Sequence, residues 1–550
     1  MNESRVSKSA RRLAVACLLV LLLPLPALPA SAEQPAPGIP LKAELKAPEA
    51  VDIPITNGAV ELTLQQAIEI ALRRNLGIVI ERYNRIHARL GVYEALGIYD
   101  LNLLADIIAD NRKSQVTSTF SPKSQEDQQL GATLSEALPT GGKVSVGPVA
   151  TRISQTFLSP NLNTIGSSFY SASLTFTYDQ PLLRNFGREA YEHGLLVAVN
   201  TSQVSQATFA AQVTAILQQV VNAYWMLVDA RGQLTVAQDS LGLARELHER
   251  NKIQVQVGTL APLELVQSQA TIATREEGII SAQEAVANAA DQLRRLLNFA
   301  PGQLWTAEIK PTTDPQTAAH PAIDLDASIA LGLQSRPELR SQEFAVELAK
   351  LNARFAHQLA KPQLDLHLTY QGTGADIGLS PTLSQATNFR FPYWKGELDF
   401  SLPLQNRAAR AATAIADIDR DRTQYELDQL KTVVITDVRQ AARRVETAAK
   451  QIDAAAAARK AQETNLDAER KRYENGMSTS FEITRIQDDL TAARSAEITA
   501  IVGYRTALAD YYRATGTLVP QSGVAIDDKD PAIQRYSFTP GKDEKAYERQ

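Results

Sequence analysis

The sequence contains one structural unit twice, and this repeat restricts the possible folds more than any other feature. The stretch Leu62–Asn75 is matched by Ile323–Arg336 at an offset of 261 residues. Farther along the chain, Val257–Gln269 is matched by Asn475–Gln487 at an offset of 218. Because apolar residues fall on apolar residues in these alignments, we expect both copies to bury the same helix faces.

The first copy carries an insertion among its strands. The segment Gln180–Leu183 aligns with Leu402–Gln405 at an offset of 222, which is 39 less than the offset of 261 at the start of the repeats. Most of this difference lies between Leu103 and Pro181. Alternating residues on both sides of the turn Pro139–Gly142 predict a β-hairpin there, from about Leu130 to Ile153.

Each copy also contains a very long helical segment. No proline occurs between Phe186 and Val257, and apolar residues recur there at three-to-four spacing. The segment Arg407–Tyr473 has the same character. About 70 residues of helix would extend on the order of 100 Å. Such rods are typical of a coiled or tunnel architecture and not of a compact domain.

Other segments alternate with a period of two, as in Ser171–Tyr178 and Gln363–Tyr370, and this pattern predicts strands with one apolar and one polar face. The glycine-rich Gly372–Gly378 is expected to be an external loop between strands. Four strands, or six with the inserted hairpin, are fewer than the roughly eight that close a barrel. We therefore expect an oligomer to complete a transmembrane barrel, and a soluble α+β protein is the alternative.

The first residues predict a secretory signal peptide, with basic residues from Arg5 to Arg12, an apolar run Leu13–Leu23 and small residues at 30–32. We expect cleavage after Ala32 and no transmembrane helix in the mature chain. The only cysteine, Cys17, lies within this peptide. The formal net charge of −5 becomes more negative once the basic leader is removed, which argues against nucleic-acid binding.

The sequence offers no catalytic constellation, so we do not expect an enzyme. Neither a cofactor nor a metal site is expected, because the histidines lack the spacing of metal ligands. These are His87, His193, His248, His320, His357 and His367.

With both copies placed, the sequence resembles the TolC or outer-membrane efflux protein family from about Leu62 to Leu518. The matching pieces include Gln180–Gly187 and Leu402–Ala411 at the strand ends, and Val257–Thr259 and Arg472–Ile483 at the helix tips. The resemblance implies a homotrimer in the outer-membrane lipid, typically with four strands per subunit, whose helices form a tunnel in the periplasm. It also implies two partners, a periplasmic adaptor protein and an inner-membrane transporter.

We therefore expect an α+β membrane protein. Its tandem-repeat protomer would contribute long α-helical hairpins to a periplasmic α-barrel and antiparallel strands to a trimeric transmembrane β-barrel. The expected segments are a signal peptide (1–32), a linker (33–61), a first repeat (62–300), a connector (301–322), a second repeat (323–520) and a disordered tail (521–550). Within the repeats we expect strands at about 100–182 and 363–404, long helices at 185–257 and 407–474, and shorter helices at 263–299 and 479–515.

The resemblance implies the exit duct of a tripartite efflux or secretion system, a passive conduit driven by the inner-membrane pump. The alternative is a periplasmic coiled-coil adaptor, or a structural protein without a pore. Nothing in the sequence indicates whether the cargo is a drug, a metal ion or a protein. In this family the hairpin tips meet the adaptor, and the tip residues here are Val257, Gly258, Thr259, Asn475, Gly476 and Met477. Both glycines would also permit the left-handed turn that ends a helix.

The same resemblance places a gate near these tips. Glu264 and Glu482 would form carboxylate rings, and Tyr473 would lock the helices by bonding Glu264. Ser478 stands where the family often has an arginine, and Arg485 stands where a second acidic ring would be. Arg485 could instead pair with Glu482, because residues three apart are helix neighbours. The alternative is that these are solvated charges at a helix end.

Overall fold

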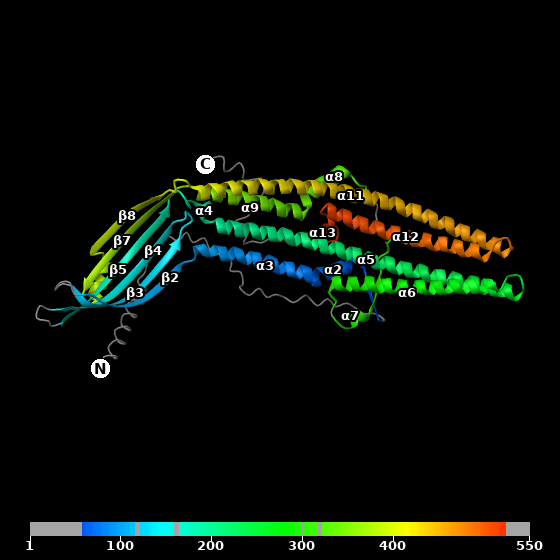
Figure 1. Ribbon diagram of the computed structural model, residues 1–550, viewed down its shortest axis with the longest axis horizontal. Helices are drawn as coiled ribbons and strands as arrows, with labels where there is room; N and C mark the ends of the chain where they lie inside the picture. The colour runs from blue at the N-terminus through cyan, green and yellow to red at the C-terminus, as the bar shows by residue number, and fades with distance from the viewer. Residues whose placement is uncertain (1–57, 116–120, 159–163, 300, 316–321, 524–550) are drawn as a thin grey trace, which may run out of the picture.

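The computed structural model is an elongated molecule with a β-sheet at one end and two helix hairpins at the other (Figure 1). It describes residues 58–115, 121–158, 164–299, 301–315 and 322–523. The predicted signal peptide and most of the predicted linker and C-terminal tail lie outside these ranges. Among the helices of the described ranges, none is both long and apolar enough to cross a membrane.

Each repeat opens with a pair of helices. The pairs are α2 (Leu64–Arg74) with α3 (Leu76–Leu96), and α8 (Leu325–Ser335) with α9 (Pro337–Leu359). Helix α2 starts with a capping box between Thr63 and Gln66. Helix α8 is capped by Asp324, whose carboxylate accepts hydrogen bonds from two backbone N–H groups. Because these caps stand at equivalent positions of the two repeats, the local start signal is duplicated along with the fold.

Four long helices form the shaft. They are α5 (His193–Gln256), α6 (Leu263–Leu297), α11 (Arg407–Glu474) and α12 (Ser480–Ala514). The 64 residues of α5 and the 68 of α11 extend about 100 Å, as predicted. Helix α5 begins eight residues later than the predicted start at 185. The preceding residues form the short helix α4 (Arg188–Tyr191), which follows the positive φ of Gly187.

The helices of the shaft lie side by side along its length (Figure 1). Near the sheet the neighbours are α3, α5, α9 and α11, and near the tips they are α6, α5, α12 and α11. The two rows meet at an apolar core, here called the equatorial core, in which Tyr224 and Trp225 are fully buried. The short elements around it are β1 (Ala59–Leu62), β6 (Glu308–Pro311), α7 (Gln303–Thr306) and α13 (Leu518–Gln521).

The sheet has six strands in the order β2-β3-β4-β5-β7-β8, and every neighbouring pair is antiparallel. The strands are β2 (Asn102–Lys113), β3 (Pro122–Ala137), β4 (Lys143–Leu158), β5 (Thr164–Pro181), β7 (Gln363–Asp376) and β8 (Phe391–Ser401). The predicted inserted hairpin is confirmed as β3 and β4, which lie within the sheet between β2 and β5. Strand β5 pairs with β7, so one sheet joins the two repeats.

The prediction of an external loop at Gly372–Gly378 is wrong over most of its length, because Gly372 and Gly374 lie inside β7. The connection to β8 instead contains the helix α10 (Leu379–Thr387), which packs across β5 and β7. A Cβ atom on Gly374 would stand 2.3 Å from the carbonyl oxygen of Thr382. These glycines therefore allow a helix backbone to approach a strand.

Candidate functional site

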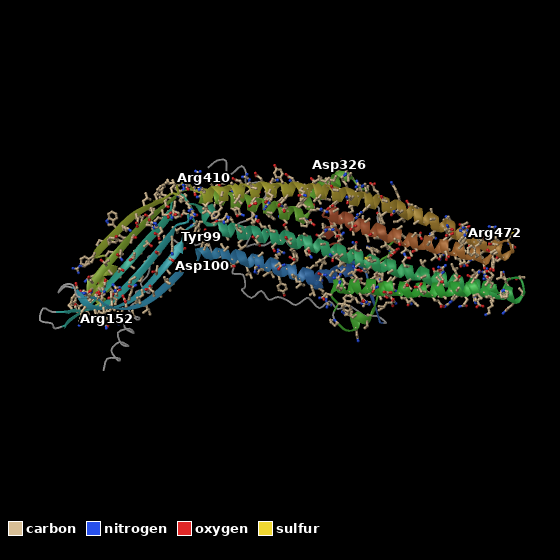
Figure 2. The ribbon with its side chains drawn as sticks, viewed as in Figure 1. Tyr99, Asp100, Arg152, Asp326, Arg410 and Arg472 are labelled. Atoms are coloured by element: carbon tan, nitrogen blue, oxygen red, sulfur yellow. The ribbon has the colours of Figure 1, made fainter. Side chains whose placement is uncertain are left out.

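The chain reverses at two helix-hairpin tips, which form the end of the molecule farthest from the sheet, near Arg472 in Figure 2. Gly258 and Gly476 occupy equivalent positions there, with φ angles of 81° and 73°. In both tips the residue after the glycine donates its backbone N–H to the carbonyl oxygen five residues earlier, at 2.9 Å. The expectation that both glycines supply the left-handed turn that ends a helix is confirmed.

Large apolar side chains stand exposed around both tips. They are Val257, Leu263, Met477 and Phe481, each more than 60% exposed. Two of these, Val257 and Met477, belong to the predicted docking residues. Clustered apolar side chains at one end of a polar shaft are typical of a surface that binds another protein.

Tyr473 lies buried between the two hairpins and is 5% exposed. Its hydroxyl group donates toward Asn251 Oδ1 at 2.7 Å and Gln254 Oε1 at 2.8 Å, both on α5. The predicted bond from Tyr473 to Glu264 is therefore wrong. The Glu264 carboxylate instead accepts from the Ser480 hydroxyl on α12. Both bonds still join the first hairpin to the second.

Burial raises the pKa of the Tyr473 phenol, and the nearby Glu264 carboxylate raises it further, against an opposing effect of Arg250. The phenol therefore stays protonated at neutral pH and acts as a hydrogen-bond donor. Its partner Asn251 is completely buried, and the Nδ2 atom of that amide has no hydrogen-bond partner within the described structure. Among the described residues, the Tyr473 hydroxyl is the donor to Asn251 Oδ1.

Two acidic side chains close to the second tip are held by local partners. Glu469 is 6% exposed and accepts from the Ser478 hydroxyl and from Arg472 Nη1, the latter at 3.0 Å. Glu482 pairs with Arg485 Nη2 at 2.9 Å, so the predicted pairing is confirmed. The hydrogen bond that the Arg485 guanidinium donates to Glu482, together with the charge of that carboxylate, raises the pKa of Arg485. Arg485 also contacts Asp489 at 3.3 Å.

Between the tips and the equatorial core, polar side chains join α5 to α12. Gln233 Nε2 donates to Thr499 Oγ1 at 3.2 Å, and the Ser495 hydroxyl donates back to Gln233. Thr491 donates to Ser240 at 3.3 Å. We call these five residues the α5–α12 seam. The two hairpins are thus joined here through hydroxyl and amide groups.

At the opposite end, the strand register separates apolar from polar side chains across all six strands. One row of aligned residues is entirely apolar and consists of Leu103, Leu134, Val146, Phe176, Tyr370 and Trp394. The adjacent row points to the other face, is entirely polar, and consists of Asn102, Ser135, Ser145, Thr177, Thr369 and Lys395. The sheet therefore has the two faces that the sequence predicts, and such a sheet can separate lipid from water.

Both edges of this sheet and of the helical row are open in the described protomer. No described strand pairs with the outer edge of β2 or of β8, and the edge residues Ile107 and Trp394 are 82% and 77% exposed. On the outer helices the exposed apolar residues are Leu76, Ile80, Tyr83 and Leu90 of α3 and Ile415, Ile418, Tyr425 and Val433 of α11. Unpaired strand edges and apolar helix stripes on both sides favour pairing with further copies.

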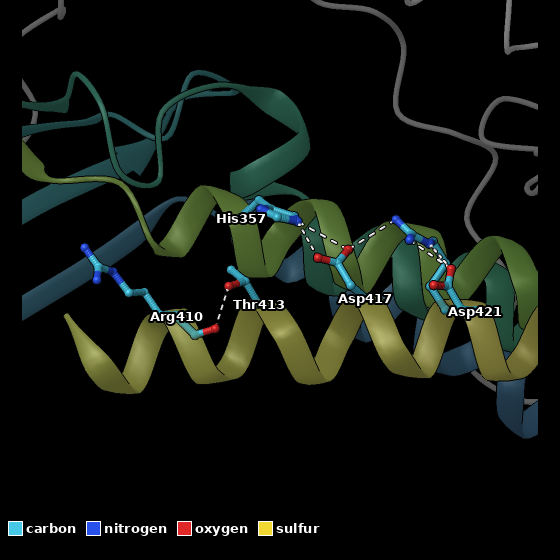
Figure 3. A network of polar contacts seen from close by, with 6 residues as sticks. His357, Arg410, Thr413, Asp417 and Asp421 are labelled. Carbon is cyan, nitrogen blue, oxygen red and sulfur yellow. Dashed lines mark hydrogen bonds and ion pairs between the residues drawn. The ribbon is translucent and has the colours of Figure 1, made fainter.

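A polar network fastens α9 to α11 close to the sheet (Figure 3). His357 Nε2 lies 3.1 Å from Asp417 Oδ2, and Arg420 Nη1 contacts the same carboxylate at 3.2 Å. Arg420 Nη2 also contacts Asp421 at 2.8 Å. This histidine, which was not expected to bind metal, thus has a carboxylate partner on the neighbouring helix.

Comparison with known proteins gives a consistent result. The family model described as "Outer membrane efflux protein" matches residues 101–298 and 329–517. The alkaline protease secretion protein AprF of Pseudomonas aeruginosa is 25% identical over 371 residues, which are 67% of this chain and 73% of that protein.

Solved structures agree in fold. The Campylobacter jejuni CmeC outer membrane channel superimposes with a TM-score of 0.62 at 14% identity, covering 92% of this chain and 96% of that one. The outer membrane protein VceC of Vibrio cholerae superimposes with a TM-score of 0.61 at 15% identity, covering 82% of this chain and 96% of that one.

Proposed function

We propose, from the premise that this chain belongs to the outer membrane efflux protein family, that three copies of it assemble into the exit duct of a tripartite efflux or secretion system. The chain is an outer-membrane channel protein that extends into the periplasm. In the proposed duct the sheets close into one transmembrane β-barrel, and the helices form a tunnel below it. A periplasmic adaptor connects the duct to an inner-membrane transporter, which supplies the energy.

The observation that carries this proposal is the pair of open edges. A sheet with an apolar and a polar face cannot stand alone in a bilayer, because the backbone groups of its edge strands would be unsatisfied in lipid. Joining β8 of one copy to β2 of the next satisfies both edges. The threefold rotation that relates neighbouring copies also brings the apolar stripe on α3 of one copy, from Leu76 to Leu90, toward the stripe on α11 of the other, from Ile415 to Val433.

We further propose that the tips are the adaptor-docking site and that the adjacent buried contacts form a gate. The exposed side chains of Val257 and Met477 offer apolar surface to a partner helix hairpin. Directly beside them, the bonds of Tyr473 and Glu264 tie the two hairpins together. An adaptor bound at the tips would thus act on the contacts that hold the duct closed.

The proposal is tested by combining fractionation with reconstitution. The protein is expected in the outer membrane as a trimer that forms ion-conducting pores in planar bilayers. A second variant, with Leu76, Ile80 and Tyr83 all changed to lysine, places like charges on the α3 stripe that would meet the next copy. This variant should no longer form the trimer. Recovery of the wild-type protein as a soluble periplasmic monomer without pore activity would refute the proposal and favour a poreless adaptor or structural protein.

The cargo is tested separately. One relative is named for the secretion of an alkaline protease, so a polypeptide belongs among the cargo classes to be tried, beside drugs and metal ions. Isolation of the cross-linked adaptor and transporter complex from cells would identify the pump, whose substrate defines the cargo.

A further inference from the structure

The β3–β4 hairpin is built as part of a membrane wall. From Leu130 to Leu134 and from Val146 to Ala150, its residues follow the two-faced pattern of the sheet. Leu130 and Ala150 are in register on the apolar face, and Gln129 and Thr151 are in register on the polar face. On the apolar face, Ala150 packs with Ala172 of β5 beneath α10. The polar face continues across strands, since Gln155 donates to Gln125 Oε1 at 3.0 Å. If the hairpin packed outside the sheet, the apolar and polar rows would not run from β2 through β3 and β4 to β5.

The hairpin also sets the width of the sheet relative to the helices below it. Six strands spaced about 4.8 Å apart and tilted about 40° span an arc of about 38 Å. Four helices at about 9 to 10 Å spacing, such as α3, α5, α9 and α11, span about 36 to 40 Å. Without the hairpin, four strands would span only about 25 Å. The hairpin therefore matches the arc of the sheet to that of the shaft.

We propose that the β3–β4 hairpin fixes the bore of the duct, so that three copies close an 18-stranded barrel as wide as the helical tunnel. This inference rests on the proposed trimeric duct. An 18-stranded barrel has a backbone radius of about 18 Å, against about 12 Å for 12 strands at the same tilt. With about 5 Å taken up by inward side chains, the clear width is about 26 Å instead of about 14 Å. The wider bore has room for two packed α-helices side by side, each about 10 Å across, whereas the narrower bore has room for one.

The hairpin can be removed without changing which face each remaining strand presents. The register runs from Ile107 through Leu130 and Ala150 to Ala172, all on the apolar face. Deleting residues 121–158 would therefore let β2 pair directly with β5, with Ile107 beside Ala172. The retained segments 114–120 and 159–163 would connect the two strands.

Distances between spin labels in the trimer measure the bore directly. The only native cysteine, Cys17, lies in the predicted signal peptide, so one introduced cysteine gives one label per subunit. A label at Leu398→Cys in β8 reports the barrel, and a label at Lys450→Cys in α11 serves as the control. In the full-length trimer the Leu398 backbone positions should lie about 31 Å apart, as a radius of about 18 Å requires. Deletion of the hairpin should shorten this separation by about 10 Å and leave the Lys450 separation unchanged.

The outcomes separate this inference from the proposed function. A trimer whose full-length Leu398 separation corresponds to about 21 Å would overturn the 18-stranded barrel and leave the duct intact. Unchanged separation after the deletion would overturn it as well. A failure of the full-length chain to give any distance between subunits would instead overturn the trimeric duct. If the deletion variant does not assemble, the full-length separation decides alone, since the two radii predict distances about 10 Å apart.

Discussion

Replacing Tyr473 with phenylalanine should shift the duct toward its open state. The change keeps the aromatic ring in place but removes the hydroxyl that donates to Asn251 on α5. Because Asn251 is completely buried, its Oδ1 atom cannot turn to water while the hairpins stay together. An unsatisfied buried acceptor costs about 1 to 3 kcal/mol. Taking the lower value in each of three subunits gives about 3 kcal/mol, or roughly a hundredfold shift in the closed-to-open ratio.

Single-channel recording in planar bilayers measures this shift as the fraction of time spent in the high-conductance state. Tyr425→Phe is the matched control, because Tyr425 lies on the same helix but away from the tips. Since Tyr425 belongs to the α11 stripe that is proposed to face the next copy, trimer formation is checked for both variants before recording. Adding Glu264→Gln to Tyr473→Phe should raise the open fraction further, since a neutral acceptor holds Ser480 less strongly than a carboxylate does. Because the Glu264 carboxylate lies near enough to raise the pKa of Tyr473, the two substitutions should be coupled, and a double-mutant cycle measures that coupling. If Tyr473→Phe and Tyr425→Phe both conduct like wild type, Tyr473 has no part in the gate.

Three further changes test other parts of the structure. Gly476→Val should destabilise the tip by about 1 to 2 kcal/mol, because valine disfavours a positive φ. Pull-down of the adaptor should then fail while the trimer still assembles. Intact adaptor binding and export would contradict docking at this tip. Arg485→Ala leaves the Glu482 charge unpaired, so the reversal potential in a salt gradient should move toward greater cation selectivity, and an unchanged potential would place Glu482 away from the pore axis. Gly374→Val should detach α10 and expose the β7–β8 connection to protease on intact cells. Gly396→Val is the control and should not have this effect, because the nearest side-chain atom to a Cβ there is 3.7 Å away. Equal protection from protease in both variants would count against the close packing of α10.

The long helices could be predicted from sequence because local signals agree with one another over many residues. The stretch that became α5 has a continuous three-to-four apolar spacing without proline, and its end is marked by Gly258. The repeat then confirms the assignment, since the same turn returns at Gly476 with the same backbone bonds. Helix existence depends on such local patterns, and it was therefore the most predictable part of the fold.

The partner of Tyr473 was not predictable in the same way. The resemblance pointed to Glu264, but the rotation of each helix about its own axis decides which neighbour a side chain meets. The signal for the true partner was present, because Leu243, Leu247 and Asn251 follow one another at four-residue intervals along α5. A polar residue in such an apolar stripe needs a polar partner opposite. Pairing it with Tyr473 requires the relative heights of α5 and α11, which no local pattern contains.

The glycines of β7 show a second limit of sequence reasoning. Gly372 and Gly374 have the composition of a turn, and their alternation with Thr373 gave no apolar signal for a strand. Glycine is required at both positions because the backbone of α10, which follows several residues later, packs directly on them and leaves no room for a Cβ atom. Tertiary contact therefore outweighs local propensity at this point.

The distribution of apolar and polar contacts along the shaft indicates where the protomer can bend. At the equatorial core, Tyr224 and Trp225 are buried among apolar residues from both repeats, and separating them would expose area at about 25 cal/mol per Å². Toward the tips, the α5–α12 seam is held by hydroxyl and amide groups, each of which loses only about 0.5 to 1.5 kcal/mol when water replaces its partner. The apolar cluster near the tips, in which Leu247 of α5 packs with Ile483 and Ile486 of α12, has fewer buried residues than the equatorial core. A motion that spreads the hairpins therefore costs least if it pivots at the equatorial core and grows toward the tips. The hydrogen bonds of Tyr473 and Ser480 lie farthest from this pivot, where the displacement is largest, and they are therefore expected to break first. We therefore expect hydrogen exchange at the tips to respond to Tyr473→Phe while exchange around Trp225 stays unchanged, and faster exchange at the core would place the pivot elsewhere.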